Sequence, residues 1–212
     1  MQSRGQFITF EGIDGSGKTT QMRLLVRRLQ TQGREVLEAI EPGGTAVGRQ
    51  IRHVLLDAAN QDLRPTTELL LYFASRAQNV EQCILPALAA GQIVVCDRFT
   101  DSTLAYQGYA RGLGAETVLA LDRIACRGLA PDLTLLIDLD LDTALARAHK
   151  RNARGATDET RMDDQSREFH QKVRDAYLAL AKQHAGRFRV IDGRGTPEEI
   201  AARVWESVAP HV

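Results

Sequence analysis

Residues 12–19 have the types and the spacing of a loop that binds phosphate groups. They read G-I-D-G-S-G-K-T, a complete G-x-x-x-x-G-K-[ST] motif, and they follow the short β-type run Phe7–Phe10. In such a loop, backbone N–H groups cradle phosphate oxygens, and the positive N-terminal end of the next helix adds to the attraction. Lys18 can reach β- and γ-phosphates, and the Thr19 hydroxyl can ligate Mg²⁺. The motif therefore predicts a site that binds the phosphates of a nucleotide.

The whole loop is expected to contact the triphosphate. Three glycines in it allow backbone angles and a close approach that a Cβ would forbid. A dinucleotide-binding fingerprint does not fit, because the residue three positions after Gly17 is Thr20 rather than glycine. The expected contacts are Gly12, Ile13, Asp14, Gly15, Ser16, Gly17, Lys18, Thr19 and Thr20.

A second pair of chemically capable residues stands at the end of another apolar run. Asp97 and Arg98 directly follow Ile93–Cys96. Ligands of doubly wound folds gather at the carboxyl ends of the strands, so Asp97 is expected to serve Mg²⁺ and Arg98 to grip a second phosphate. Asp138 is the competing strand carboxylate, and we rank it second because nothing basic adjoins it.

The elements that would position these residues alternate between strand and helix along the chain. Runs at 7–10, 35–40, 93–96, 133–139 and 188–191 are β-rich, and amphipathic segments lie at 19–32, 47–58, 66–90, 115–127, 141–151, 166–185 and 197–208. Nearly continuous apolar runs are typical of strands buried on both faces of a parallel sheet. We expect an α/β, three-layer P-loop NTPase fold, a five-stranded parallel sheet with helices on both faces, in one domain over residues 1–212.

Composition narrows the class of function. The 212 residues carry 27 Lys plus Arg and 27 Asp plus Glu, so the net charge is zero. Proteins that grip nucleic acid usually show a basic excess, and we expect no nucleic-acid partner. The three cysteines have no metal-site spacing and are expected to be reduced thiols. No apolar run approaches membrane-span length, so we expect no membrane partner and a cytoplasmic location.

Residues 150–165 depart from packed-core character, because alanine and methionine are their only apolar residues. A solvated loop is one interpretation of this segment. The other is a mobile lid whose arginines close over phosphates, since the planar guanidinium pairs with phosphate oxygens through two hydrogen bonds.

Separated motifs narrow the nucleotide-binding class further. The guanine-reading N/T-K-x-D and the transporter L-S-G-G-Q are both absent from the sequence. Residues 10–20, the E-P-G-G-T turn at 41–45, the segment D-R-F-T-D-S-T-L-A-Y-Q at 97–107 and P-D-L at 131–133 together resemble the thymidylate kinase family, over nearly the full length. The resemblance implies phosphoryl transfer from ATP to dTMP, with Mg²⁺, in a homodimer.

The resemblance also implies an acceptor site. An aromatic ring would stack on thymine one helical turn before Arg76; Tyr72 and Phe73 both fit that spacing, and the choice stays open. Arg98 would hold the dTMP phosphate, and Tyr106 would crowd a ribose 2′ position. The residues implied for the acceptor are Asp14, Glu41, Pro42, Tyr72, Phe73, Arg76, Arg98, Ser102, Thr103, Tyr106 and Gln107.

Two positions depart from the family pattern. Phe99 stands where tyrosine or histidine is usual, so a hydrogen bond from that residue is lost. Gly15 stands where another branch of the family has an arginine, so the transferred charge must be met by the lid. The lid candidates are Arg154 and Arg161 for catalysis, with Arg147 and Arg151 for ATP. Arg147 and the turn 191–193 are candidates for contacting adenine.

Other functions stay open on the sequence alone. A uridylate, cytidylate or deoxynucleoside kinase would share the architecture, and one methyl group discriminates thymine by only about 1–3 kcal/mol. A nucleotide-dependent switch or a DNA-associated ATPase is the alternative outside the kinases, and the neutral charge argues against the ATPase.

Overall fold

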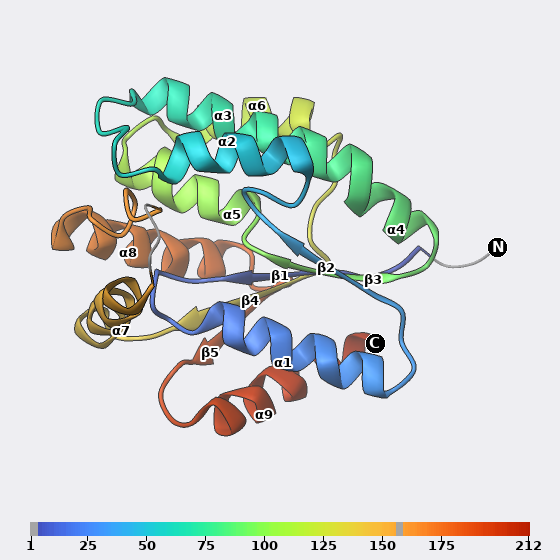
Figure 1. Cartoon of the computed structure of the whole chain (residues 1–212). Coiled ribbons are helices and arrows are strands. Elements are labelled where there is room, and N and C mark those ends of the chain that lie inside the picture. Colours follow the sequence, from blue (N-terminus) through green and yellow to red (C-terminus); the bar gives the residue numbers. More distant parts are fainter. Residues whose placement is uncertain (1–3, 156–158) are drawn as a thin grey trace.

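The computed structural model describes residues 4–155 and 159–212. Within these residues, five strands form one parallel sheet in the order β2-β3-β1-β4-β5 (Figure 1). They are β1 (Phe7–Glu11), β2 (Val36–Ile40), β3 (Ile93–Asp97), β4 (Leu133–Asp138) and β5 (Phe188–Asp192). Because all pairs are parallel, the carboxyl ends of the strands share one edge, and the phosphate loop and Asp97 meet there.

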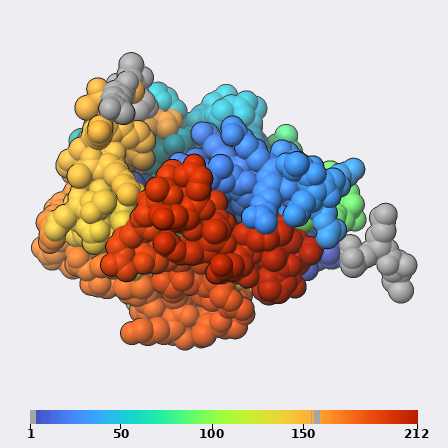
Figure 2. All heavy atoms as spheres, turned by 90° about the horizontal axis from the view of Figure 1, so that it is seen from below, coloured from blue at the N-terminus to red at the C-terminus, as the bar shows by residue number. Residues whose placement is uncertain are grey.

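Helices cover both faces of the sheet (Figure 1). One face carries α1 (Lys18–Thr31) and α9 (Pro197–Val208), which lie side by side in Figure 2, with the Arg28 guanidinium 3.8 Å from the centre of the Trp205 ring. The other face carries α3 (Pro65–Asn79), α4 (Leu85–Ala89), α6 (Ala115–Ala125) and α8 (Arg167–Gln183). The remaining helical segments are α2 (Ala46–Leu56), α5 (Thr100–Thr103), α7 (Leu141–Arg154), the π-helices η1 (Val80–Ile84) and η2 (Leu104–Ala110), and the 3₁₀ turn η3 (Ala209–His211).

Side-chain alternation along β1 divides the core into two layers. Ile8 and Phe10 pack with α1 and α9, whereas Phe7 packs with the helices of the opposite face. A strand sends successive side chains to opposite faces, so Glu11 shares the face of Phe7 and points toward α5 and α8.

The predicted α/β fold with a five-stranded parallel sheet is confirmed. The strand ends agree with the sequence to within one residue, and Thr196 and Glu199 form the capping box that starts α9. The predicted helix at 66–90 is an unbroken run of α3, η1 and α4. The helical segment at 100–110 was missed. Its buried polar residues, such as Thr103 and Gln107, give no amphipathic pattern, because they face a cavity rather than solvent.

Candidate active site

The loop between β1 and α1 has the shape of a phosphate cradle. A Cβ on Gly12 would lie 2.6 Å from the Ile137 carbonyl oxygen, and one on Gly15 would lie 1.9 Å from that of Ala144. Gly17 has a left-handed conformation at the N-cap of α1 and supplies no side-chain cap, so the first N–H groups of the helix stay available to an anion. The contact of Gly15 with α7 also excludes an arginine at that position in this backbone arrangement.

Asp14 bridges two cations above this cradle. Its Oδ1 lies 3.5 Å from Lys18 Nζ and accepts a hydrogen bond from Arg98 Nη2 at 2.7 Å, while Oδ2 accepts one from the Tyr106 hydroxyl at 3.0 Å. Burial alone would raise the pKa of Asp14, but Arg98 and Lys18 hold it well below its ordinary value. Burial and the nearby Arg98 cation lower the pKa of Lys18. An incoming phosphate would relieve this repulsion between the two cations.

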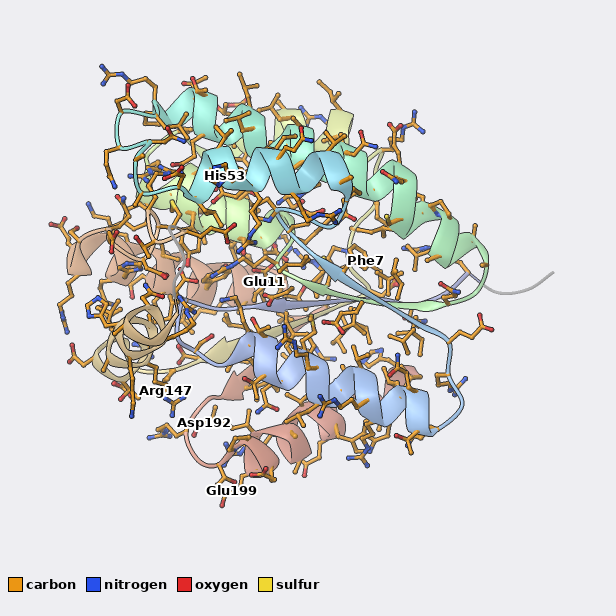
Figure 3. The ribbon with its side chains drawn as sticks, viewed as in Figure 1. Phe7, Glu11, His53, Arg147, Asp192 and Glu199 are labelled. Carbon is orange, nitrogen blue, oxygen red and sulfur yellow. The ribbon has the colours of Figure 1, made fainter. Side chains whose placement is uncertain are left out.

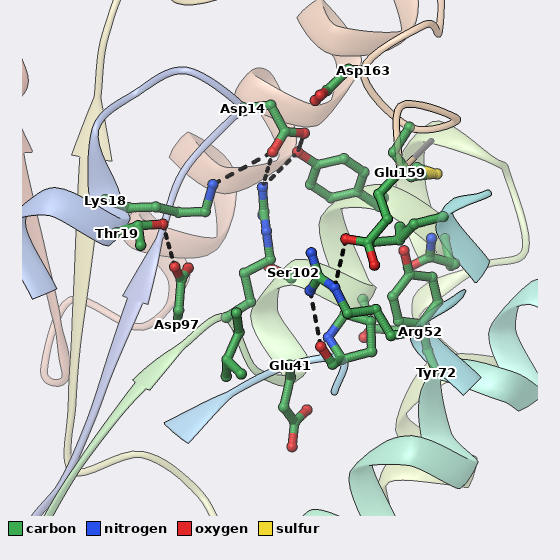
Figure 4. Close-up of a pocket in the computed structure, with 18 of the residues that line it drawn as sticks. Asp14, Lys18, Thr19, Glu41, Arg52, Tyr72, Asp97, Ser102, Glu159 and Asp163 are labelled. Atoms are coloured by element: carbon green, nitrogen blue, oxygen red, sulfur yellow. Dashed lines mark hydrogen bonds and ion pairs between the residues drawn. The ribbon is translucent and has the colours of Figure 1, made fainter. Parts of the chain in front are cut away.

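Thr19 and Asp97 meet as expected for a pair that serves a metal ion. The Thr19 hydroxyl donates a short hydrogen bond to Asp97 Oδ2 (Figure 4). The other carboxylate oxygen, Oδ1, is buried and has no hydrogen-bond partner among the described residues. A hydroxyl and a carboxylate are oxygen ligands of the kind that Mg²⁺ prefers, and the residues therefore fit that ion.

Arg98 is the centre of a hydrogen-bonded cluster. Its Nη1 donates to the hydroxyls of Ser102 and Tyr177, both at 3.0 Å, and its Nη2 also reaches the Tyr106 hydroxyl at 3.2 Å. The Arg98 backbone has a φ of 71°, which non-glycine residues rarely adopt. Such a conformation persists where the surroundings fix it, as this cluster does.

These residues surround a cavity of about 330 Å³. The cavity brings together predicted residues from five separate segments of the sequence (Figure 4). Those that line it are Asp14, Lys18, Thr19, Glu41, Pro42, Tyr72, Arg76, Asp97, Arg98, Ser102, Thr103, Tyr106, Gln107 and Arg151.

The cavity distinguishes the two candidate aromatic rings. Tyr72 lines the cavity, whereas Phe73 is 4% exposed and packs in the core, 5.0 Å from the Arg76 guanidinium. Arg76 is held by an ion pair with the buried Glu41, and its guanidinium lies 5.1 Å from the centre of the Phe99 ring. Phe99 therefore packs against Arg76 in the core, where its side chain makes no hydrogen bond, as expected from the sequence.

The lid arginines lie in three different environments. Arg151 lines the cavity and pairs with Asp163 at 2.6 Å, and Arg147 is exposed on α7 (Figure 3). Arg161 is buried and pairs with Glu68 at 2.7 Å, so here it is engaged away from the lining of the cavity. The side chain of Arg154 and residues 156–158 lie outside the described part. The catalytic roles of Arg154 and Arg161 stay predictions.

Several lining residues were missed from the sequence. Arg52 comes from α2, donates to the Pro42 carbonyl oxygen at 3.0 Å and pairs with Glu159 of the predicted lid at 2.9 Å. Nothing in the amphipathic pattern of α2 distinguishes Arg52 from a surface arginine. The Arg98 partner Tyr177 lies 79 residues beyond it, and only the fold brings the two together.

Comparison with known proteins agrees with this site. A sequence model of the thymidylate kinase family matches residues 10–204. The chain is similar to the thymidylate kinases of Pelobacter propionicus, 52% identical over 206 residues covering 96% of this chain and 94% of that protein, and of Trichlorobacter lovleyi, 48% identical over 203 residues covering 95% and 96%. The crystal structure of a thymidylate kinase from Ehrlichia chaffeensis superposes with a TM-score of 0.78 at 34% identity, covering 96% of this chain and 98% of that one.

Proposed function

This chain belongs to the thymidylate kinase family and transfers a phosphoryl group from ATP to dTMP, and we propose that its phosphate loop and the cavity around Arg98 hold the two nucleotides with their phosphates facing each other. The observation that carries the proposal is the bridge from Asp14 to both Lys18 and Arg98. Lys18 is the cation expected at the donor phosphate, and Arg98 is the cation expected at the acceptor phosphate. Both pair with the Asp14 carboxylate.

Phosphoryl transfer depends on positioning the two phosphates and neutralising their negative charge more than on covalent chemistry by the protein. Lys18 would neutralise charge on the β- and γ-phosphates, and Arg98 would hold the dTMP phosphate in line with them. No general base is required, because the acceptor is already an anionic phosphate oxygen. Arg151, from the lid side of the cavity, would add positive charge near the transferred group.

Mg²⁺ would be held by Thr19 and Asp97, and it would supply positive charge to the ATP phosphates as charge develops on them. The buried and unpartnered Asp97 Oδ1 supports this assignment. The hydrogen bond between Thr19 and Asp97 holds the two oxygen ligands side by side.

At the opposite wall, Tyr72 would stack on thymine while Arg76 and Gln107 would contact the base. The ion pair from Glu41 supports a fixed direction for Arg76, and Gln107 is fixed by donating to the buried Glu68 at 2.8 Å. Tyr106, held by Asp14 and Arg98, would stand against the sugar and favour deoxyribose.

A homodimer is supported by apolar side chains on α2, α3 and α6. Val54, Leu70 and Leu119 are exposed on these helices, and Ile124 has 77% of its surface exposed. Burying this apolar face against a second copy would remove it from water. Sedimentation equilibrium tests the assembly: a species of one chain's mass at micromolar concentration would contradict it.

Within the described residues, no helix is long and apolar enough to span a membrane. The cysteines Cys83, Cys96 and Cys126 are free thiols, which supports a cytoplasmic location.

The acceptor is tested by ADP release with ATP and Mg²⁺ across a panel of nucleoside monophosphates. We expect the largest kcat/KM for dTMP. Turnover of dUMP should be moderately slower, because it lacks only the methyl group of thymine. Turnover of UMP should be much slower, because it also carries the ribose 2′-hydroxyl. Faster turnover of UMP or CMP than of dTMP would contradict the proposed role of Tyr106.

A further inference from the structure

Glu11 is a fully buried carboxylate that has no role in the proposed phosphoryl transfer. It is the last residue of β1, directly before the phosphate loop, and it has no exposed surface. Taking a carboxylate out of water is costly unless hydrogen bonds replace the lost solvation. The partners of Glu11 therefore indicate what keeps it there.

Its two oxygens accept hydrogen bonds from three donors. Oε2 accepts from the Ser102 hydroxyl at 2.5 Å and from the Tyr177 hydroxyl at 3.0 Å. Oε1 accepts from the Phe99 backbone N–H at 2.8 Å. Both hydroxyls are buried, so water does not compete for them.

The same two hydroxyls are the acceptors for Arg98 Nη1. Each hydroxyl has a single proton to donate. When that proton points to Glu11, the lone pairs of Ser102 and Tyr177 are left facing the guanidinium. The oxygens of these two hydroxyls also lie 2.7 Å apart, where either could donate to the other. When both protons are drawn to Glu11, the carboxylate sets the direction of the hydrogen bonds between the hydroxyls and Arg98.

The third donor fixes the backbone of Arg98. The N–H of Phe99 belongs to the peptide that follows Arg98, whose φ of 71° is otherwise unfavourable. Glu11 therefore acts on Arg98 by two indirect routes, through the hydroxyls that accept from the guanidinium and through the next peptide.

We propose that Glu11 is a positioning residue that holds the Arg98 guanidinium toward the acceptor phosphate, acting through the hydroxyls of Ser102 and Tyr177 and the peptide of Phe99. The inference rests on the proposed role of Arg98 as the ligand of the dTMP phosphate. Glu11 itself touches no substrate. Its effect is on acceptor binding, and the triphosphate site is left unchanged.

The substitution Glu11→Gln keeps the shape of the side chain but replaces one acceptor oxygen with an NH₂ donor. The Phe99 N–H requires the amide oxygen, so the amide NH₂ points at Ser102 and Tyr177. Their lone pairs must then be shared between that NH₂ and Arg98, and a hydroxyl proton loses its acceptor.

Burial and the neighbouring Asp101 raise the pKa of Glu11 to about 7, while Arg98 works in the opposite direction. At pH 8 the wild-type group is therefore mainly a carboxylate, and the comparison belongs at that pH.

The test is calorimetric binding of dTMP and of a non-hydrolysable ATP analogue at pH 8. Glu11→Gln is expected to raise the dTMP Kd at least tenfold and to leave the ATP-analogue Kd within twofold. The matched control is Thr9→Val, on the same strand and face and equally buried, which removes the hydrogen bond to Thr134 and should leave both constants unchanged.

Arg98→Ala separates the two levels of the proposal. A dTMP Kd unaffected by Arg98→Ala would refute the role of Arg98 itself. If Arg98→Ala raises the Kd and Glu11→Gln does not, the positioning role is wrong while the proposed function stands.

A double-mutant cycle tests the path from Glu11 to Arg98. Tyr177→Phe should raise the dTMP Kd about threefold, and its effect should shrink when Glu11→Gln is already present, because both act on one hydrogen-bonded unit. Independent, multiplying effects would contradict the path. If Glu11→Gln does not fold, Tyr177→Phe alone still decides: an unchanged dTMP Kd overturns the inference.

Discussion

Arg98 and Asp14 lie 84 residues apart in the sequence, yet the Arg98 Nη2 atom donates to an Asp14 oxygen at 2.7 Å. A carboxylate inside a loop built for anions would repel its ligand if it stood alone. Here it joins the phosphate loop to the cation that follows β3, and Lys18 lies at its other side. The ion pair fixes the spacing between the two predicted phosphate positions.

Removing Lys18 should stop catalysis and spare the fold. We expect Lys18→Ala to lower kcat by at least about a thousandfold, because its positive charge is aimed at the phosphates as they react. Steady-state ADP release measures the loss, and the melting temperature checks the fold. Lys182→Ala, an exposed lysine on α8, is the matched control and should retain full activity. Activity kept within tenfold in Lys18→Ala would remove that residue from the mechanism.

Tyr72 and Phe73 should differ in what their loss affects. Tyr72→Ala is expected to reduce kcat/KM for dTMP by about 10–200-fold, the effect of losing a base stack of about 1–3 kcal/mol. Phe73→Leu should change mainly the free energy of unfolding, by about 1 kcal/mol, since its ring is packed in the core. Tyr72→Phe, which keeps the ring, is the control and should bind dTMP normally. The reverse pattern would assign the stack to Phe73.

Arg161 and Arg151 should separate stability from turnover. Arg161→Ala removes a buried partner of Glu68 and should lower the free energy of unfolding by about 3 kcal/mol. Arg151→Ala changes a side chain that is 57% exposed, so stability should change by less than about 1 kcal/mol while kcat falls more than ATP affinity. Urea unfolding and single-turnover rates measure the two effects. A normal stability with a large loss of kcat in Arg161→Ala would instead support its catalytic role.

Glu11 should make stability depend on pH between about 4.5 and 7. Burial and Asp101 raise its pKa from 4.5 to about 7, so the folded chain holds a proton that the unfolded chain has released. The stabilisation is fully present below pH 4.5 and is lost as the pH rises through 7. The shift corresponds to about 3 kcal/mol. Urea unfolding across this range should show the decline in wild type relative to Glu11→Gln. The lowered pKa of Asp14 acts in the opposite direction and only below pH 3.8. A difference between the two proteins that does not change with pH would contradict the assignment.

The parts of the site that a local motif specifies could be read from the sequence. The phosphate loop places Lys18 and Thr19 by its own geometry, and Asp97 follows a buried strand whose end must lie at the ligand edge of the sheet. Periodicity alone gave the order of elements, because each strand and each long helix has one consistent apolar pattern.

The parts that depend on packing between distant segments could not be read. Spacing allowed either Tyr72 or Phe73 at the cavity, and only the rotation of α3 against the core settles which of them lines it. Nothing in the sequence distinguishes Arg161 from the other lid arginines, because its partner Glu68 lies on α3, far away along the chain. Glu11 and Tyr177 carry no local signal, because their roles arise from contacts more than 75 residues away along the chain.

The most direct test of the central claim is a crystal structure of the chain with dTMP and a non-hydrolysable ATP analogue. We expect the analogue's phosphates on residues 12–19, the dTMP phosphate against Arg98 and its base against Tyr72, with the two phosphate groups adjacent beside Asp14. A dTMP molecule bound away from Arg98, or a cavity left empty at saturating dTMP, would contradict it.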